Sequence, residues 1–267
     1  MPELAEVAFY AKQWEPAVGQ AVLRVLLHGK SRVFRKCDLA TLERKLPGRR
    51  LVGAKTHGKQ MLFQFTEDCS LGIHLGMTGA LRVEPAGFEP GRHDHLVLHM
   101  AGATLVFHDP RQFGNIHFHS EHAWPTAWQA LPPQPMDAAF TTTRLTQILE
   151  QHARQPLKAL LLVQRHFPGI GNWMADEVLW QMKLPPQHLA GNLSAAQRAS
   201  LHRVLRKVCS VALQTIGVDW SDPPQTWLFR YRWEPGHKCP RCHGELVRET
   251  VRGRTACWCP TCQPAPE

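Results

Sequence analysis

The chain has 267 residues, 43% of them hydrophobic and 20% charged, which is typical of a globular protein with two or three domains. Its 31 Lys and Arg residues exceed its 22 Asp and Glu residues, and the net charge of +9 indicates a polyanionic partner, nucleic acid or an anionic membrane surface. The longest aliphatic run, residues 159–163, is far shorter than the roughly 20 residues that span a bilayer, and the acidic N-terminus does not resemble a signal peptide. We therefore expect an intracellular protein in a reducing compartment.

The first expected element is a helix from residue 1 to about residue 18. Pro2 suits the first position of a helix, and Glu3 and Glu6 complement the positive end of the helix dipole. The apolar residues that share one face of this helix are Leu4, Val7, Ala8 and Ala11.

Residues from about 20 to 119 predict mainly β-strands. Met61, Phe63 and Phe65 alternate with polar residues, as expected for a strand with one buried face. Turn signals separate the apolar runs at residues 47–48, 76–79 and 85–91. The pattern therefore predicts a compact β domain behind one leading helix.

Residues 120–136 are rich in proline and lack periodicity, which indicates a linker between domains. Helical periodicity then returns, first in a short helix over residues 157–164. A second helix is expected to run through Trp180 with Asn172 as its cap, and Ser194 with Gln197 predicts a capping box before a third.

The C-terminal segment carries two C-x-x-C pairs that are separated by 16 residues. They consist of Cys239, Cys242, Cys259 and Cys262. This spacing predicts one structural zinc ion bound tetrahedrally by four thiolates; a redox-active pair or chance clustering are the alternatives. A tail of about 35 residues cannot build its own core, so metal binding would supply the missing folding energy. Cys257 lies two residues before Cys259 and could compete with it as a ligand.

Two features of the helical region suit contacts with phosphate. The turn of residues 169–172 precedes a helix and can present backbone N–H groups to an anion, with Lys158 close enough to join them. An ordinary tight turn explains the same residues equally well. In the cysteine-rich tail, Arg252 and Arg254 fall in the expected hairpin turn, where an arginine can reach into a DNA groove.

A loop over residues 109–113 joins two of the expected strands. Arg111 and Phe113 lie two residues apart and so project to one side of an extended segment. An arginine and an aromatic side chain at a loop tip can fill the gap that an extruded base leaves in a duplex, and Met77 is a third candidate for this role. Core packing of Phe113 and Met77 is the simpler interpretation of the isolated residues.

Pro2 is a candidate nucleophile because removal of Met1 would expose a free secondary amine. An α-amino group has a lower pKa than a lysine, and it can form an iminium with the aldehyde carbon of a sugar. Glu3 beside it and Glu6 one turn further can exchange protons with the sugar and the amine. From the local sequence alone, a favourable helix start is the preferred interpretation of Pro2.

Together these motifs resemble the formamidopyrimidine-DNA glycosylase and endonuclease VIII family over nearly the whole chain. The matching segments are residues 1–7, 58–59, 73–79, 93–95, 109–114, 157–158, 169–172 and 175–177, followed by the cysteine pairs that end in Cys262-Gln263. Their order and spacing are too specific to arise by coincidence.

The resemblance implies an α+β protein of three domains. Residues 1–125 would form an N-terminal catalytic β-sandwich with flanking helices, and residues 137–221 a helix–two-turn–helix DNA-binding domain. Residues 229–267 would form a zinc-finger β-hairpin with one structural zinc ion. The implied partner is damaged double-stranded DNA, with single-stranded or abasic DNA as further possibilities, and no membrane. The implied state is a monomer in the bacterial cytoplasm, associated with the nucleoid.

The resemblance also implies an activity: the enzyme excises an oxidised or ring-opened base and then opens the strand by β,δ-elimination through a Schiff base. The residues that match catalytic positions are Pro2 as nucleophile, Glu3 as acid–base, Glu6 as a support for the charged intermediate, and Lys59. Those that match DNA contacts are His74, His93, Lys158, Asn172 and Arg254, with Met77, Arg111 and Phe113 in the space vacated by the base.

One departure from the family concerns the substrate. The stretch from Gly217 to Tyr231 is several residues shorter than in typical formamidopyrimidine enzymes and lacks their glycine-rich loop over the lesion. Its prolines restrict rearrangement of the backbone, whereas its tryptophans offer flat surfaces for stacking. We therefore expect weak discrimination for 8-oxoguanine and better relative activity on ring-opened purines, oxidised pyrimidines or abasic sites, including in single strands.

The sequence leaves three alternatives open. An endonuclease VIII-like enzyme would prefer oxidised pyrimidines or abasic sites. A non-catalytic protein that binds damaged DNA would have no need of Pro2, Glu3 and Lys59 together. A zinc-ribbon interaction module would explain the tail but not the other 230 or so residues.

Overall fold

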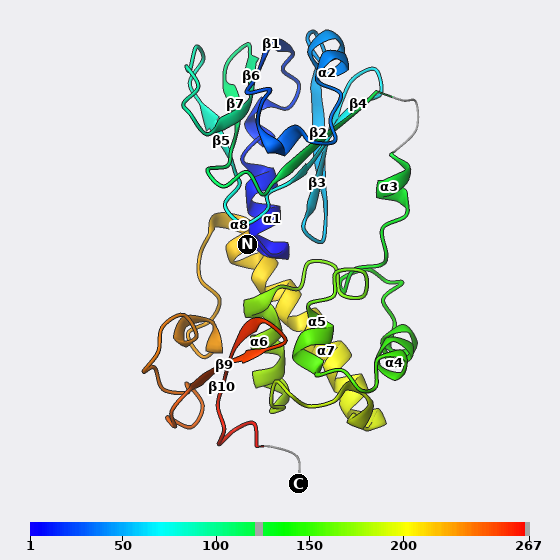
Figure 1. Ribbon diagram of the computed structural model, residues 1–267, viewed down its shortest axis with the longest axis vertical. Helices are drawn as coiled ribbons and strands as arrows, with labels where there is room; N and C mark the ends of the chain where they lie inside the picture. The colour runs from blue at the N-terminus through cyan, green and yellow to red at the C-terminus, as the bar shows by residue number, and fades with distance from the viewer. Residues whose placement is uncertain (121–124, 265–267) are drawn as a thin grey trace. The chain divides into compact units, whose positions relative to one another are not determined.

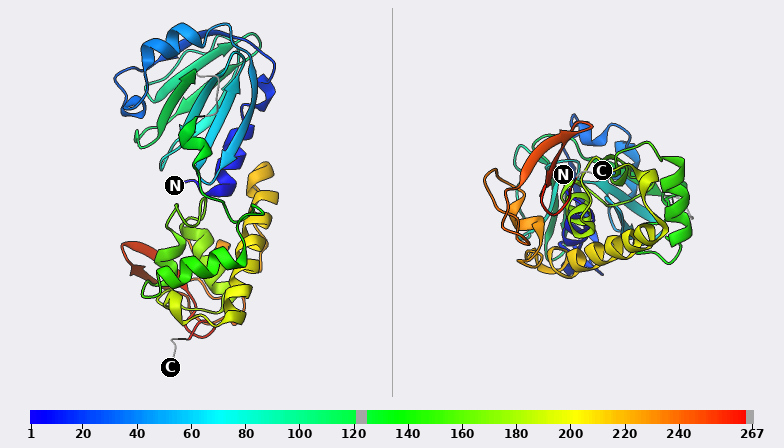
Figure 2. Two further views of the ribbon diagram at one scale, coloured as in Figure 1. Left: turned by 90° about the vertical axis from the view of Figure 1, so that its right-hand side faces the viewer. Right: turned by 90° about the horizontal axis from the view of Figure 1, so that it is seen from below.

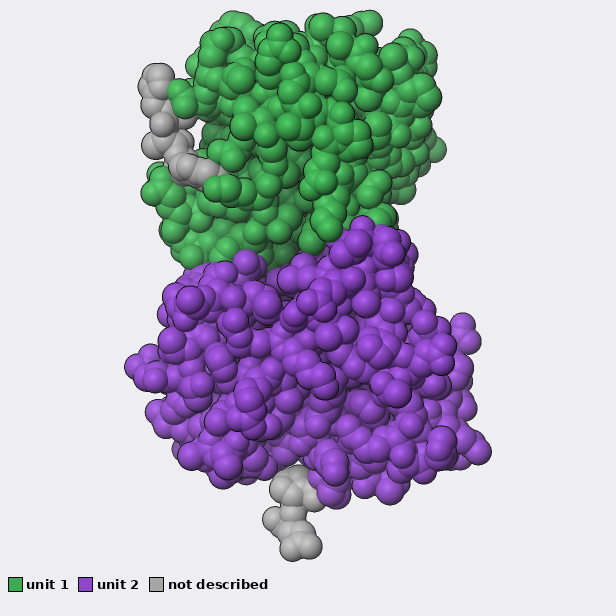
Figure 3. All heavy atoms as spheres, turned by 180° about the vertical axis from the view of Figure 1, so that it is seen from behind, with its two compact units in different colours: residues 1–2, 6–131 green, residues 3–5, 132–267 purple. Residues whose placement is uncertain are grey.

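The computed structural model describes residues 1–120 and 125–264, which fall into two compact units (Figure 3). Unit 1 consists of residues 1–2 and 6–131, and unit 2 consists of residues 3–5 and 132–267. Unit 2 thus includes three residues next to the N-terminus as well as the C-terminal half of the chain. Among the described residues, none of the helices is long and apolar enough to span a membrane.

Unit 1 is a β-sandwich of two antiparallel four-stranded sheets (Figure 1). One sheet has the order β1-β6-β7-β5, with bounds Val22–Leu27, Asp94–Met100, Thr104–His108 and Ala80–Glu84. The other has the order β2-β3-β4-β8, with bounds Leu51–His57, Gln60–Phe65, Cys69–His74 and Asn115–Ser120. Phe63 from one sheet and Phe107 from the other are fully buried in one shared core, so the predicted β domain is confirmed.

The leading helix α1 spans only Leu4–Lys12, followed by the 3-10 turn η1 at Glu15–Ala17. The expected helix from residue 1 to about residue 18 was therefore too long. At its start, the N–H of Leu4 donates to the carbonyl of Gly169 in unit 2, so Pro2 and Glu3 precede the helix. The flanking elements η2 and α2 span Arg32–Phe34 and Leu39–Lys45.

Unit 2 is mainly helical and ends in a two-stranded hairpin (Figure 2). Its helices are α4 (Thr142–Gln151), α5 (Leu157–Leu161), α6 (Asn172–Met182), η3 (Ala190–Asn192), α7 (Ala195–Gln214), α8 (Ile216–Asp219) and η4 (Leu228–Tyr231). The hairpin pairs β9 (Val247–Val251) with β10 (Arg254–Trp258). The predicted capping box of Ser194 and Gln197 is present at the start of α7.

The expected linker of residues 120–136 contains a short helix, α3 (Thr126–Gln129). Residues 121–124 of this linker lie outside the described part of the chain.

Candidate active site and nucleic-acid interface

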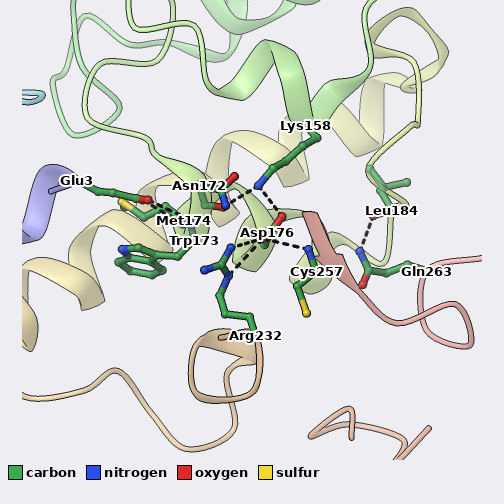
Figure 4. Close-up of polar contacts among 10 residues, drawn as sticks. All are labelled: Glu3, Lys158, Asn172, Trp173, Met174, Asp176, Leu184, Arg232, Cys257 and Gln263. Carbon is green, nitrogen blue, oxygen red and sulfur yellow. Dashed lines mark hydrogen bonds and ion pairs between the residues drawn. The ribbon is translucent and has the colours of Figure 1, made fainter. Parts of the chain in front are cut away.

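Glu3 is buried against the start of α6, which lies in the same unit. Its Oε1 accepts a hydrogen bond of 2.9 Å from the backbone N–H of Trp173, and its Oε2 one of 3.1 Å from that of Met174 (Figure 4). These amides belong to the first turn of the helix, where N–H groups lack partners and the helix dipole favours a negative charge. The carboxylate next to Pro2 is therefore held in a fixed position.

The glycine turn before α6 is shaped for this carboxylate. A Cβ atom on Gly171 would overlap the Glu3 side chain, so the close approach requires glycine. Gly171, and not Asn172 as expected, occupies the N-cap position. The anion that the turn was predicted to bind is, in this structure, the chain's own Glu3.

The other predicted catalytic residues are partly or largely buried. Pro2 and Glu6 are half-buried, and Glu6 lies in the first turn of α1. Lys59 occupies the tight turn between β2 and β3 and is 6% exposed. Burial lowers the pKa of His74, and the positive charges of Lys59 and Arg35 add to the effect. His74 thus lies close to Lys59 in unit 1.

Two loops of unit 1 bring Met77, Arg111 and Phe113 to the surface. Met77 is 44% and Phe113 45% exposed, and the Arg111 guanidinium lies over the Phe113 ring at 4.7 Å. A Cβ on Gly76 would overlap the backbone of Phe113, so the two loops touch. Because Met77 and Phe113 are exposed, they are not packed in the core of unit 1, and the core-packing interpretation of these two residues is wrong.

Asp109 stabilises the shape of these two loops. Its buried carboxylate accepts hydrogen bonds from the hydroxyl of Thr78 at 2.7 Å and from the N–H of Gly114 at 2.8 Å, and so links one loop to the other. Gln112 has a left-handed φ of 54° and its Oε1 accepts the N–H of Arg32. These hydrogen bonds attach the loop of residues 109–113 to the rest of unit 1. His93 lies beside this region, since its carbonyl accepts the N–H of Asp109.

Lys158 is fully buried, which the sequence did not predict. Its Nζ donates to the carboxylate of Asp176 at 2.5 Å and to the carbonyl of Asn172 at 2.7 Å. Burial lowers the pKa of this lysine, whereas the charge of Asp176 opposes the shift. The expected phosphate contact does not fit this arrangement, because the ammonium group is enclosed by the protein.

Asp176 and Arg232 are buried polar residues to which the sequence assigned no role. Residues 175–177 were recognised only as a family match, and Arg232 carried no motif. The carboxylate of Asp176 binds the guanidinium of Arg232 at 2.6 Å and the backbone N–H of Cys257 at 3.2 Å. A buried aspartate with two basic partners leaves no periodic signal in a sequence.

The four predicted cysteine ligands converge. Among the described residues they form the one group of three or more potential ligands whose ligand atoms all lie within 4.8 Å of one another. The Sγ atoms of Cys239 and Cys262 are 3.9 Å apart, and those of Cys242 and Cys259 are 3.5 Å apart. A zinc ion with bonds of about 2.3 Å would hold tetrahedral sulfurs roughly 3.8 Å apart, so the cluster fits such an ion.

Cys257 is not part of this cluster. Its thiol is buried, and burial raises its pKa to about 11, with the charge of Asp176 adding to the effect. Arg252 has a left-handed φ of 49° in the two-residue hairpin turn, and Arg254 is exposed at the start of β10. The hairpin thus presents Arg254 at its tip.

Two family profiles match the chain: the formamidopyrimidine-DNA glycosylase N-terminal domain over residues 1–116, and the formamidopyrimidine-DNA glycosylase H2TH domain over residues 131–221. The chain belongs to the formamidopyrimidine-DNA glycosylase family. Its relatives include the formamidopyrimidine-DNA glycosylase of Thermus thermophilus, which is 35% identical with 98% of each chain covered. That of Carboxydothermus hydrogenoformans is 29% identical, with 98% of this chain and all of the relative covered.

Solved structures of glycosylases in this family show the same fold. The complex of Lactococcus lactis Fpg with DNA containing an abasic site matches with a TM-score of 0.88 at 26% identity, covering 98% of this chain and all of the other. The complex of the same protein with DNA containing Fapy-dG has a TM-score of 0.87 at 26% identity, covering 98% of this chain and 100% of the other.

In this glycosylase, the short stretch from Gly217 to Tyr231 is anchored at its end. Trp227 and Leu228 are buried, and Phe229 packs edge-on against Trp173 with ring centroids 4.9 Å apart. Trp220, by contrast, is 47% exposed and adopts a left-handed φ of 66° after α8. The segment therefore has one packed end and one exposed aromatic residue.

Proposed function

We propose that Pro2 is the nucleophile of this DNA glycosylase and AP lyase, and that Glu3 is its acid–base group. The observation that supports the proposal is the Glu3 carboxylate, which two N–H groups of α6 hold directly next to Pro2 in the chain. A positioned carboxylate contributes to catalysis by moving protons at the reacting atoms. Glu6, one turn further, would support the charged intermediate, and Lys59 is the fourth proposed catalytic residue.

In the proposed reaction, the amine of Pro2 attacks the anomeric carbon of the damaged nucleotide. The bond from the sugar to the base breaks, the base leaves with a proton, and a Schiff base joins Pro2 to the opened sugar. Elimination of first one and then the other phosphate opens the strand on both sides. Glu3 would deliver and remove the protons of these steps from its fixed position.

The proposed partner is damaged DNA, bound by a monomer. The net charge of +9 and the exposed Arg254 support phosphate contacts, and His74, His93 and Asn172 are further candidates. The similar Lactococcus lactis protein was solved with DNA that contains an abasic site or Fapy-dG. Met77, Arg111 and Phe113 would fill the space that the extruded nucleotide leaves.

The proposed metal of the cysteine cluster is one structural zinc ion. Four thiolates leave no open coordination position, so the ion would stabilise the hairpin and take no part in the chemistry. Cys239, Cys242, Cys259 and Cys262 would hold it.

Glu3→Gln tests the assignment of the acid–base group. We expect single-turnover base excision to fall by about a hundredfold or more, while strand cleavage at a preformed abasic site changes by less than about threefold. The reason is that an abasic site needs no base to be expelled. Equal loss of both activities would contradict a separate role of Glu3 in excision.

We further propose that the enzyme discriminates weakly for 8-oxoguanine. The segment of residues 217–231 is packed only at its C-terminal end, and it contains two prolines and no glycine after Gly217. Its backbone is therefore restricted in closing over a base, whereas the exposed Trp220 offers a stacking surface. We expect better relative activity on ring-opened purines, oxidised pyrimidines or abasic sites, as in an endonuclease VIII-like enzyme. Single-turnover rates on matched duplexes test this: excision of 8-oxoguanine opposite cytosine at least about tenfold faster than any other base lesion would contradict it.

A further inference from the structure

Asp176 is a buried carboxylate at the meeting point of four elements of unit 2. It lies in α6 and is 1% exposed. One oxygen accepts the ammonium of Lys158 from α5, and the other accepts the guanidinium of Arg232, which follows η4, and the backbone N–H of Cys257 from β10 (Figure 4). Both oxygens of this carboxylate are thus bound, and each partner comes from a different part of the chain.

One branch of this network leads to Glu3. Lys158 binds Asp176 and also the carbonyl of Asn172, the first residue of α6. The two residues that follow, Trp173 and Met174, donate the N–H groups that hold the Glu3 carboxylate. Asp176 and Lys158 therefore fix the helix turn on which the position of Glu3 depends.

The other branch leads to the cysteine hairpin. Cys257 lies in β10 between the two C-x-x-C pairs, and its N–H is bound by Asp176. Arg232 in turn accepts a hydrogen bond on its carbonyl from Arg248 of β9. At the far end of α6, the indole N–H of Trp180 donates to Sγ of Cys239 at 3.4 Å. The hairpin thus contacts the same helix whose first turn holds Glu3.

We propose that Asp176 is a positioning residue that couples the cysteine hairpin to the Glu3 carboxylate. The hairpin would then set the rate of base excision as well as the affinity for DNA. This inference rests on the proposed role of Glu3. The competing explanation is an ion cluster that contributes to stability alone, because two buried cations need an anion.

The two explanations differ in the ratio of the two activities. Loosening the first turn of α6 displaces Glu3, and small displacements of a catalytic group cost large factors in rate. With Asp176→Asn at saturating enzyme, we expect single-turnover base excision to fall at least about tenfold and cleavage of preformed abasic sites to change less than about threefold. A stability role alone would lower both activities together, through the fraction of folded enzyme.

Asp94→Asn is the matched control. Asp94 is also buried and binds two basic side chains, Arg82 at 2.7 Å and His108 at 2.8 Å, but it lies in the sandwich of unit 1. We expect it to leave the ratio of excision to abasic cleavage unchanged. A ratio that changes equally in both variants would overturn the proposal.

Lys158→Met provides a second test of the coupling in case Asp176→Asn does not fold. It removes the bridge to Asn172 but leaves Asp176 paired with Arg232 and Cys257. We expect zinc content and DNA affinity like those of the wild type, slower base excision, and hydrogen exchange at the amides of Trp173 and Met174 faster by about tenfold or more. Unchanged exchange and excision would overturn the proposal.

Glu3→Gln, measured in parallel, distinguishes the proposed role of Glu3 from the proposed coupling through Asp176. If Glu3→Gln leaves base excision intact, the proposed role of Glu3 is wrong, and the coupling, which acts through the position of Glu3, is wrong with it. If Glu3→Gln abolishes excision but Asp176→Asn and Lys158→Met do not change the ratio of activities, the coupling alone fails.

Discussion

At the scale of single residues, Glu177 shows how burial changes the chemistry of a side chain. It follows Asp176 in α6 and is fully buried. Burial raises its pKa to about 7, although hydrogen bonds from Gln181 and from the backbone of Leu228 and Phe229 oppose the shift. The folded protein therefore holds a proton here that the unfolded chain releases at lower pH.

We predict that Glu177→Gln makes the protein more resistant to alkaline pH. Between about pH 4.5 and about pH 7, the wild-type unfolded state loses this proton while the folded state keeps it, so stability falls as the pH rises. The variant should match the wild type near pH 4.5 and exceed its free energy of unfolding by about 2–3 kcal/mol at pH 8. Urea unfolding at several pH values measures the difference, and a gap independent of pH would contradict it.

At the scale of elements, the fold of the cysteine hairpin depends on its four clustered cysteine side chains, which lie within 23 residues of one another in the sequence. It buries few apolar side chains of its own: its core cluster includes Cys239, Cys257 and Cys259 together with Trp180 and Leu228 of the helical part. The hairpin should therefore fold only with its metal.

We predict that Cys242→Ser loses the proposed zinc ion and weakens DNA binding, because the hairpin that carries Arg254 no longer folds without the metal. Cys257→Ser is the matched control, since Cys257 is a buried cysteine of the same hairpin outside the cluster. It should retain about one zinc ion per chain. Metal analysis of both purified variants provides the test, and loss of zinc from Cys257→Ser would overturn the ligand assignment.

Local patterns predicted most of the elements but not the contacts between them. The alternation of Met61, Phe63 and Phe65 and the capping box at Ser194 depend on neighbours a few residues away, so they were visible in the sequence. The start of α1 and the burial of Lys158 depend on Gly169 and Asp176, which come from distant segments. Amine chemistry made Pro2 and Glu3 candidates, and the resemblance to the family favoured them over a simple helix start. The role of Gly171 depends on the close approach of the Glu3 side chain, which no local pattern indicates.

At the scale of the whole molecule, the excess of basic residues should appear in the salt dependence of DNA binding. Arg254 is exposed, and we predict that Arg254→Ala lowers the slope of log affinity against log salt by about 0.9, the value for one phosphate contact. Lys158 is enclosed and paired, so Lys158→Ala should lower stability and leave the slope unchanged. Binding titrations with an undamaged duplex measure both, and a full unit lost in Lys158→Ala would contradict this distinction.

The proposed mechanism depends on the amine of Pro2, which would carry the covalent chemistry of this glycosylase. Intact-mass measurement should first show that Met1 has been removed, because a blocked proline cannot form an iminium. Borohydride added to the processed protein and an abasic duplex should then trap a covalent adduct, and peptide mapping should place the DNA on the N-terminal peptide at Pro2. A processed wild-type protein that gives no adduct, or an adduct that maps to a lysine elsewhere, would contradict the account.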